Sequence, residues 1–493
     1  MKIGTVSIIL TGKINLKKKY FYNLLLSVVN ILFPILSFPY ASHILGPIGI
    51  GKVQFVISFA QYFALLAAIG IPIYGIKETA KHRDDPRKLA AVFTEITSIF
   101  FITSLLFSAV YFIIIFSFPF FSNERNLYLV AGILIVLSFS YTDWFYSGIE
   151  EFKAIALRSI LIKSISLILL YTLVKTEADF AKYLSITVFS IIGNQVLGFA
   201  LVFKKTKFDF INLDFKRHLQ PLIFIFSASI AASIYTVLDT VILGFLSDEK
   251  AVGLYTASVK LIKITLPFVT SMGVILIPSI SNHIANNKLD EAKILLKKSY
   301  DFLVFFSIPV ALGLALLAPE FIFVFSGSKF LSATVSMQIL SLLPILIGLG
   351  HFLSFQILIP FGKNKELFYA MLAGVFVCLI SNLILVPFFR EKGASIANVI
   401  TELIVTVLYL YFIRKFFKVN FNLKLIVQSV ISAVPFILII FLFRNSQIGS
   451  MYVLVFSVLV CTLFYTLIQI LLFKNSFVLN FIKTIQAQLS QKK

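Results

Sequence analysis

Apolar runs of about 20 residues recur along almost the whole chain, and this pattern restricts the fold more than any other feature. A run of that length spans the hydrocarbon core of a bilayer as an α-helix. Only 13% of the 493 residues are charged, whereas a soluble globular chain is typically about 25% charged. The sequence therefore predicts an all-α polytopic membrane protein with about 14 transmembrane helices.

The polar gaps between these runs predict the orientation of the chain. Basic residues gather in alternate gaps, for example at 77–88 and 204–217. Because Lys and Arg concentrate in cytoplasmic loops, an even number of spans places both termini in the cytoplasm. The first run follows Lys17, Lys18 and Lys19 and is too long for a cleavable signal peptide, so we expect a retained first span in a cytoplasmic membrane. The net charge of +21 then reflects topology and attraction to anionic membrane lipids, and no nucleic-acid partner is expected.

A faint internal repeat divides most of the chain into two halves. The first run ends in a segment that contains Gly46, Pro47, Gly49 and Gly51, a combination that punctuates a tight turn. A similar glycine-containing segment follows the seventh run, and in each half the next run leads to a basic segment. Such parallel repeats are typical of transporters whose substrate site lies between the halves.

The repeat predicts two six-helix bundles around a central cavity, with two additional transmembrane helices at the end. We expect the N-terminal bundle at residues 1–218 and the C-terminal bundle at 219–420. Residues 421–493 then hold the two additional helices and a cytoplasmic tail.

Four basic residues lie inside or at the edge of apolar runs. Lys260 and Lys263 are three residues apart and share one helical face, roughly 12 and 17 Å into the bilayer by the rise of a helix. Lys163 and Arg158 lie nearer the end of another run. A charge at mid-bilayer costs roughly 2.5–3.5 kcal/mol, so such residues normally face a partner or a water-filled cavity. We predict that all four line a cationic cavity that binds an anionic substrate. The alternatives are an internal ion pair for Lys260 and Lys263, snorkelling for Lys163, and a topology residue near the interface for Arg158.

Four acidic residues have comparable positions: Asp143, Asp239, Glu95 and Glu402. A carboxylate inside the membrane either pairs with a basic group or takes up and releases protons when burial raises its pKa. Each acid is therefore a candidate for ion coupling or for a structural pair.

Motifs for soluble enzyme chemistry are missing from the sequence. It contains no Walker A loop, no cluster of His and Cys with metal-ligand spacing, and no nucleophile elbow. The two cysteines, Cys378 and Cys461, lie within apolar runs and predict no disulfide framework. We therefore expect a transporter rather than an enzyme, with no cofactor and no metal.

Three groups of residues resemble the Wzx-type polysaccharide flippases. The first is the segment with Gly46, Pro47, Gly49 and Gly51, followed by Glu78-Thr79-Ala80-Lys81. The second is an aspartate-tryptophan motif, Asp143-Trp144-Phe145-Tyr146-Ser147-Gly148. The third combines Asp239 with Leu243-Gly244 and a Val-Gly-Leu-Tyr segment that ends at Tyr255.

The resemblance implies the fold of the multidrug/oligosaccharidyl-lipid/polysaccharide exporter superfamily. It also implies a substrate, an undecaprenyl-pyrophosphate-linked oligosaccharide, which is moved across the cytoplasmic membrane by alternating access for O-antigen or other surface polysaccharide. The cationic residues would compensate the pyrophosphate in a medium of low dielectric constant. Polysaccharide polymerase and chain-length proteins are the protein partners implied.

Two related functions remain open at this point. A flippase for peptidoglycan precursors is the nearest alternative, because its members carry additional helices. A cation-coupled multidrug exporter of the same superfamily is the other, and it should have an acidic cavity. A glycan polymerase or ligase usually needs a large extracytoplasmic loop, and the largest gap on that side is short.

Overall fold

A computed structural model describes residues 3–211, 213–419, 421–446 and 448–475 of the chain. Helices make up nearly all of this part, and the described ranges contain no strand. The predicted all-α fold is therefore confirmed. The α-helices are α1 (Ile3–Ala68), α2 (Ile71–His82), α3 (Pro86–Ser117), α4 (Arg125–Val136), α5 (Asp143–Gly148), α6 (Phe152–Leu173), α7 (Phe180–Val202), α8 (Lys216–Leu246), α9 (Glu249–Ala285), α10 (Leu289–Leu316), α11 (Ala318–Ser326), α12 (Thr334–Leu340), α13 (Leu343–Leu353), α14 (Asn364–Ile413), α15 (Leu423–Ala433), α16 (Pro435–Asn445) and α17 (Ser450–Leu471).

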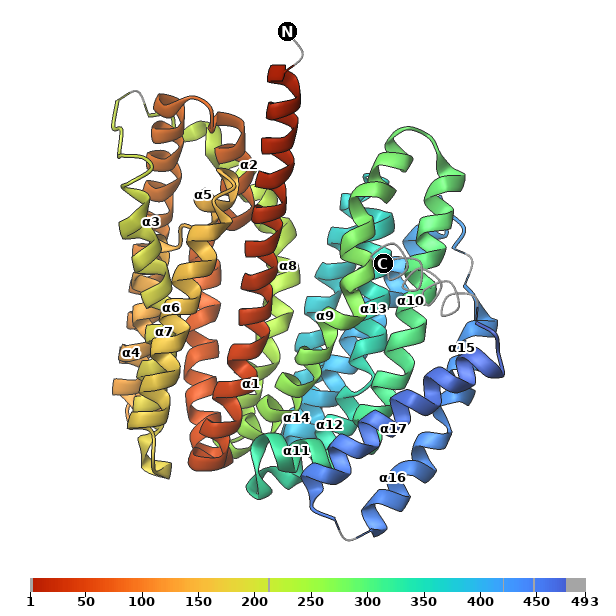
Figure 1. Ribbon diagram of the computed structural model, residues 1–493. Coiled ribbons are helices and arrows are strands. Elements are labelled where there is room, and N and C mark those ends of the chain that lie inside the picture. Colours follow the sequence, from red (N-terminus) through yellow and green to blue (C-terminus); the bar gives the residue numbers. More distant parts are fainter. Residues whose placement is uncertain (1–2, 212, 420, 447, 476–493) are drawn as a thin grey trace. The chain divides into compact units, whose positions relative to one another are not determined.

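The helices form two compact units (Figure 1). Unit 1 is Met1–Val241 and unit 2 is Ile242–Lys493, so the division falls inside α8. The limits expected from the sequence repeat, at 218 and 420, stay predictions. The expected cytoplasmic tail from residue 476 onward lies outside the described residues.

Within the described part of the chain, ten helical segments are long and apolar enough to cross a membrane, or eleven when the bent pair Arg125–Val136 and Ser138–Gly148 is counted as one span. Two of the ten, Phe21–His82 and Asn364–Ile413, contain 62 and 50 residues, and each is long enough for two crossings. A multi-pass membrane protein is confirmed, whereas the number of fourteen spans stays a prediction.

The long element α1 consists of two helices joined at Gly46. The backbone of Gly46 has a φ of 65°, a conformation that glycine adopts readily. Pro47 follows directly, and its fixed φ and missing N–H suit the first position of a new helix. The tight turn predicted at this Gly-Pro pair is therefore confirmed.

The core of unit 1 packs α2 against α3 and α5 through large aromatic side chains. Tyr74, Phe93 and Trp144 are buried in one cluster, together with Phe145. The rings of Phe93 and Trp144 are nearly parallel, with centroids 6.0 Å apart. This cluster fixes the position of α5, which carries the aspartate-tryptophan motif.

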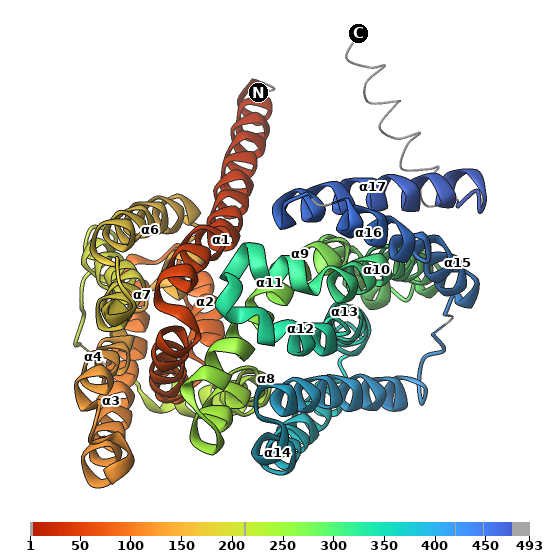
Figure 2. The same cartoon turned by 90° about the horizontal axis from the view of Figure 1, so that it is seen from below.

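The last three helices belong to unit 2 and pack on α10 and α11. Figure 2 shows α15, α16 and α17 next to one another beside α10. Buried Phe436, Cys461 and Tyr465 join the side chain of Phe305 in one cluster, and the Tyr465 hydroxyl donates to the Phe305 carbonyl at 2.8 Å. The additional C-terminal helices are thus attached to a specific surface of unit 2.

Candidate functional site

Lys260 and Lys263 lie on α9 of unit 2, within a segment of membrane-spanning length. They are three residues apart and therefore share one face of this helix. Lys260 is half-buried and Lys263 is exposed. The buried Thr256 precedes them by one turn, and its hydroxyl has no hydrogen-bond partner among the described residues. Two like charges therefore lie on one helix of membrane-spanning length, while their depth and their place in a cavity stay predictions.

Lys163 extends from α6 of unit 1 toward α1. Its ammonium group donates a hydrogen bond to the side-chain oxygen of Asn30 and lies 5.5 Å from the ring centre of Phe33. Both partners are neutral, so they orient the ammonium group without cancelling its charge. Lys163 is half-buried, and it remains a candidate for contact with an anion.

Arg158 is deeply buried in unit 1 and forms an ion pair with Asp143. Its guanidinium group lies 4.9 Å from the ring centre of Tyr146, and the Tyr146 hydroxyl donates to the Gly198 carbonyl at 3.0 Å. A Cβ atom added at Gly198 would collide with the guanidinium group. The structure therefore brings together two residues that were predicted separately. Their ion pair joins α5 to α6, and the guanidinium group packs against Gly198 of α7. This geometry favours a structural role for both residues over a place in an open cavity.

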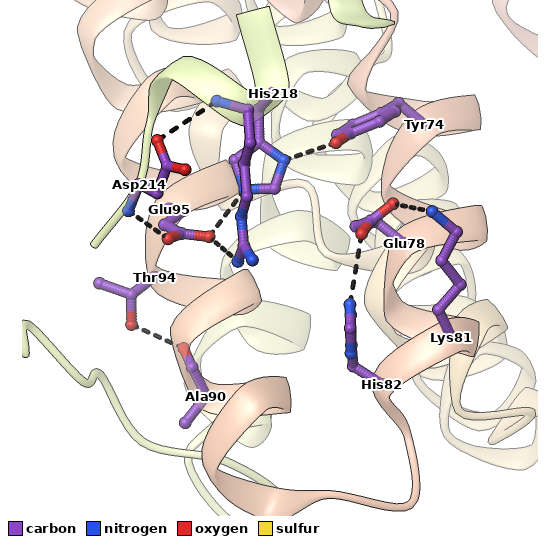
Figure 3. Close-up of polar contacts among 10 residues, drawn as sticks. Tyr74, Glu78, Lys81, His82, Ala90, Thr94, Glu95, Asp214 and His218 are labelled. Atoms are coloured by element: carbon purple, nitrogen blue, oxygen red, sulfur yellow. Dashed lines mark hydrogen bonds and ion pairs between the residues drawn. The ribbon is translucent and has the colours of Figure 1, made fainter. Parts of the chain in front are cut away.

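Glu95 on α3 anchors the segment that leads into α8 (Figure 3). Its carboxylate accepts a hydrogen bond from the Asp214 backbone N–H at 2.6 Å, forms an ion pair with Arg217 and lies 2.7 Å from His218 Nε2. The other ring nitrogen of His218 lies 2.6 Å from the Tyr74 hydroxyl. Since an ionised carboxylate only accepts hydrogen bonds, the contact with Glu95 requires the proton on Nε2, and Tyr74 then donates to Nδ1. Arg217 Nε, 3.2 Å from the same Nε2, cannot donate to it in this tautomer, so the Glu95 carboxylate is the acceptor for Arg217. Of the two functions predicted for Glu95, the structural one fits this network.

The other two predicted acids are buried. Asp239 lies on α8, and Glu402 lies on α14 of unit 2. Both remain candidates for ion coupling.

The aspartate-tryptophan motif contributes close packing in unit 1. A Cβ atom added at Gly75 of α2 would lie only 2.6 Å from Cε3 of Trp144. One added at Gly148 would lie 2.5 Å from Cβ of Thr79. The motif on α5 and the Glu78-Thr79-Ala80-Lys81 segment on α2 therefore pack closely against each other. In α1, a Cβ atom added at Gly49 would lie 3.1 Å from Cβ of Leu45, and Gly51 is buried inside the second helix of α1.

A cavity of about 370 Å³ inside unit 1 was not predicted from the sequence. Apolar side chains form most of its wall, and its polar groups are Gln61, Ser138, Tyr141 and Gln195. The side-chain oxygen of Gln195 is buried and has no hydrogen-bond partner among the described residues. Neutral amide and hydroxyl groups of this kind can bind hydroxyl-bearing molecules, and no charge pattern in the sequence marks them.

The described residues contain no group of three or more His, Cys, Asp or Glu side chains that could hold a metal ion. Both cysteines are buried, and neither forms a disulfide within the described ranges.

Comparison with known proteins identifies relatives along the chain. A family profile described as polysaccharide biosynthesis protein matches residues 16–283, more than half of the sequence. The chain is 25% identical over 410 residues to the "Putative O-antigen transporter" of Escherichia coli K12, a match that covers 82% of this chain and 98% of that protein. It is also 25% identical over 256 residues to the "Probable low-salt glycan biosynthesis flippase" of Haloferax volcanii, covering 50% of this chain and 54% of that protein.

Solved transporter structures share the fold. The structure "Lipid II flippase MurJ, inward closed conformation" is similar with a TM-score of 0.72 at 17% identity, and the match covers 93% of this chain and 99% of that chain. A MATE transporter in its straight conformation is similar with a TM-score of 0.53 at 14% identity, covering 80% and 95% of the two chains. At such low identity these matches show the fold alone. The resemblance indicated by the motifs is confirmed: the chain belongs to the polysaccharide biosynthesis protein family and is a multi-pass membrane transporter, not an enzyme.

Proposed function

We propose that the chain is a flippase for undecaprenyl-pyrophosphate-linked oligosaccharides used to build O-antigen or a related surface polysaccharide. The observation that carries this proposal is the match along nearly the whole length of an O-antigen transporter, together with the family profile. The protein moves its substrate from the cytoplasmic to the outer leaflet by alternating access. It works in the bacterial cytoplasmic membrane with both termini in the cytoplasm, and polysaccharide polymerase and chain-length proteins act on the delivered product.

The intramembrane lysines suit an anionic substrate. A pyrophosphate that leaves water for a medium of low dielectric constant needs compensating positive charge, and ammonium groups provide it through charge-assisted hydrogen bonds. Lys260 and Lys263 are the leading candidates, because two like charges side by side on α9 are stabilised when an anion binds between them. Lys163 is the third candidate, since its partners carry no charge.

Two of the four acidic residues form described ion pairs with arginines of unit 1. Asp143 pairs with Arg158 and Glu95 with Arg217, so we assign both acids structural roles. Asp239 and Glu402 are the candidates for coupling transport to an ion gradient, because a buried carboxylate that gains and loses a proton can link the two processes.

Deleting the gene in its host tests the function. The proposal predicts loss of surface polysaccharide and accumulation of the lipid-linked oligosaccharide in the membrane, both reversed by expression of the wild-type chain. Growth arrest with accumulation of the peptidoglycan precursor would instead identify a peptidoglycan-precursor flippase. Normal surface polysaccharide combined with increased drug sensitivity would identify a multidrug exporter.

Lysine variants in the same strain test the site. Lys260→Gln and Lys263→Gln should each restore much less surface polysaccharide than wild type at equal protein level. Lys293→Gln is the matched control, because this exposed lysine of unit 2 pairs with Asp290 one turn away on α10. Full export by both intramembrane variants would refute the assignment of these lysines.

A further inference from the structure

Unit 1 has a second pocket, of about 200 Å³, at the end of α2 and the beginning of α8. It is lined by Tyr74, Lys77, Glu78, Lys81, Arg217 and Pro221. Three of these side chains are cationic and one is anionic, and Arg217 also pairs with Glu95 behind the wall, which leaves a net charge of about +1 at neutral pH. The volume is far larger than the space that a single water molecule needs. The pocket therefore has the charge and the size for a small anionic group.

The wall of this pocket is held by buried polar contacts (Figure 3). Tyr74 and Glu78 are buried, and the Tyr74 hydroxyl lies 2.6 Å from His218, which in turn contacts Glu95. Arg217 is tied to the same network through its ion pair with Glu95. The position of the Arg217 guanidinium group relative to α2 is thus fixed by groups that lie behind the pocket.

The single carboxylate in the pocket wall is already shared. Glu78 accepts a hydrogen bond from Lys81 at 2.9 Å, and its second oxygen lies 3.3 Å from His82 Nε2. Lys77 has no hydrogen-bond or ion-pair partner within the described ranges of the chain. The pocket consequently keeps positive charge that its own acid does not neutralise.

The surroundings indicate which anion would reach this place. Residues 77–88 form one of the basic segments that predict the cytoplasmic surface of the membrane. At that level the abundant anions are the phosphate groups of lipids, which attract Lys and Arg by about 1 kcal/mol per residue. A phosphate also has several acceptor oxygens, which suit donors converging from two helices.

We propose that this pocket binds a lipid-borne phosphate at the membrane surface of unit 1. Lys77, Lys81 and Arg217 donate to its oxygens, and the site is separate from the lysines of α9 that we assign to transport. Two kinds of lipid carry such a phosphate group: an anionic bilayer phospholipid, in its head group, and a polyprenyl carrier, at its phosphate end. Binding at the pocket can be measured without transport, so it stands or falls independently of the flippase function.

Lipid titration of the full-length protein, followed by native mass spectrometry, tests the proposal. The purified protein in neutral detergent is titrated with phosphatidylglycerol, undecaprenyl phosphate, phosphatidylcholine or inorganic phosphate. We expect the first two to bind more tightly than phosphatidylcholine, and the tighter of the two identifies the source. Equal binding of inorganic phosphate and the anionic lipids would show a site for soluble anions and would overturn the lipid assignment.

Two charge-matched variants separate a specific pocket from general attraction. Lys77→Gln removes an exposed lysine without a partner and should weaken binding of the anionic lipid about fivefold. Lys88→Gln removes an equally exposed lysine of the same unit that does not line the pocket, and it should change binding less than twofold. Equal losses in the two variants would show diffuse electrostatic attraction and would overturn the pocket. Unchanged melting temperatures of both variants confirm that each remains folded.

Discussion

The buried ion pair between Asp143 and Arg158 allows a prediction whose size follows from the structure. The Arg158 side chain is 2% exposed and that of Asp143 is 22% exposed. Removing one partner of a buried pair leaves an uncompensated charge and costs about 3–5 kcal/mol. Asp143→Asn leaves the fully enclosed guanidinium group and should reach that range. Arg158→Gln leaves a carboxylate that water reaches in part, so its cost should be smaller, about 1–3 kcal/mol.

The double variant, Asp143→Asn with Arg158→Gln, removes both charges and should be less destabilised than Asp143→Asn alone. We therefore expect a coupling free energy of at least about 1 kcal/mol in the double-mutant cycle, because it must exceed the cost of Arg158→Gln alone. The assay is reversible unfolding of the purified protein in detergent micelles, followed by far-UV circular dichroism. Arg83→Gln is the control, because Arg83 pairs with Glu150 at 2.7 Å on an exposed surface, where ion pairs contribute about 0–1 kcal/mol.

Two results would refute this reasoning. One is additivity, in which the double variant loses the sum of the two single losses, because then the side chains do not interact. The other is full stability of Asp143→Asn, which would mean that Arg158 reaches water. A double variant that is stable but has lost export would instead show that Asp143 and Arg158 take part in transport.

Three further predictions concern packing, pH dependence and the C-terminal helices. Gly75→Ala should destabilise the protein by about 1–3 kcal/mol, because its Cβ would lie 2.6 Å from Trp144. Gly313→Ala, where a Cβ meets nothing within 4 Å, should be neutral or stabilising by up to about 1 kcal/mol; equal effects of the two in thermal unfolding would contradict the packing argument. The pKa of Asp248 is lowered overall: desolvation raises it, but hydrogen bonds from the Ala251 backbone and the Arg390 side chain lower it more. Ionised Asp248 therefore stabilises the folded protein when the pH is above the pKa of Asp in the unfolded chain, about 3.9. This stabilisation is lost as the pH falls through the lower pKa of Asp248 in the folded protein. Asp248→Asn should remove this part of the pH dependence, and a melting-temperature profile unchanged from wild type below about pH 4 would contradict it. Arg444→Ala breaks the bidentate contact of α16 with Glu320 on α11, at 2.6 and 2.7 Å, and should speed amide hydrogen exchange in α16 while leaving unit 1 unchanged. Unaltered exchange in α16 would show that the pair does not hold this helix.

The features that follow from local sequence were predictable. Hydropathy gave membrane-length helices, because the bilayer imposes both their length and their composition. The turn at Gly46 was predictable because glycine and proline have restricted conformational roles that do not depend on the rest of the fold. Motif residues also indicated the family before any packing was known.

The partners of the intramembrane charges could not be predicted in the same way. Arg158 meets Asp143 because the chain bends between α5 and α6, where Glu150 has a φ of 62°. Glu95 meets Arg217 and His218 because a long connection folds back on α3. These contacts depend on tertiary structure, and hydropathy records only that a charge is present. The cavity around Gln61 and Gln195 was missed because neutral polar residues give no periodic or charge signal.

Translocation by the purified protein is the most direct test of the central claim. The protein is reconstituted in liposomes that carry undecaprenyl-pyrophosphate-linked oligosaccharide from its host, and a sugar-modifying enzyme added outside reports the substrate in the outer leaflet. We predict that wild-type protein makes the inner-leaflet substrate accessible, that the variant with both Lys260→Gln and Lys263→Gln does so much more slowly, and that Lys293→Gln matches wild type. Equal accessibility with and without protein would contradict the flippase function itself.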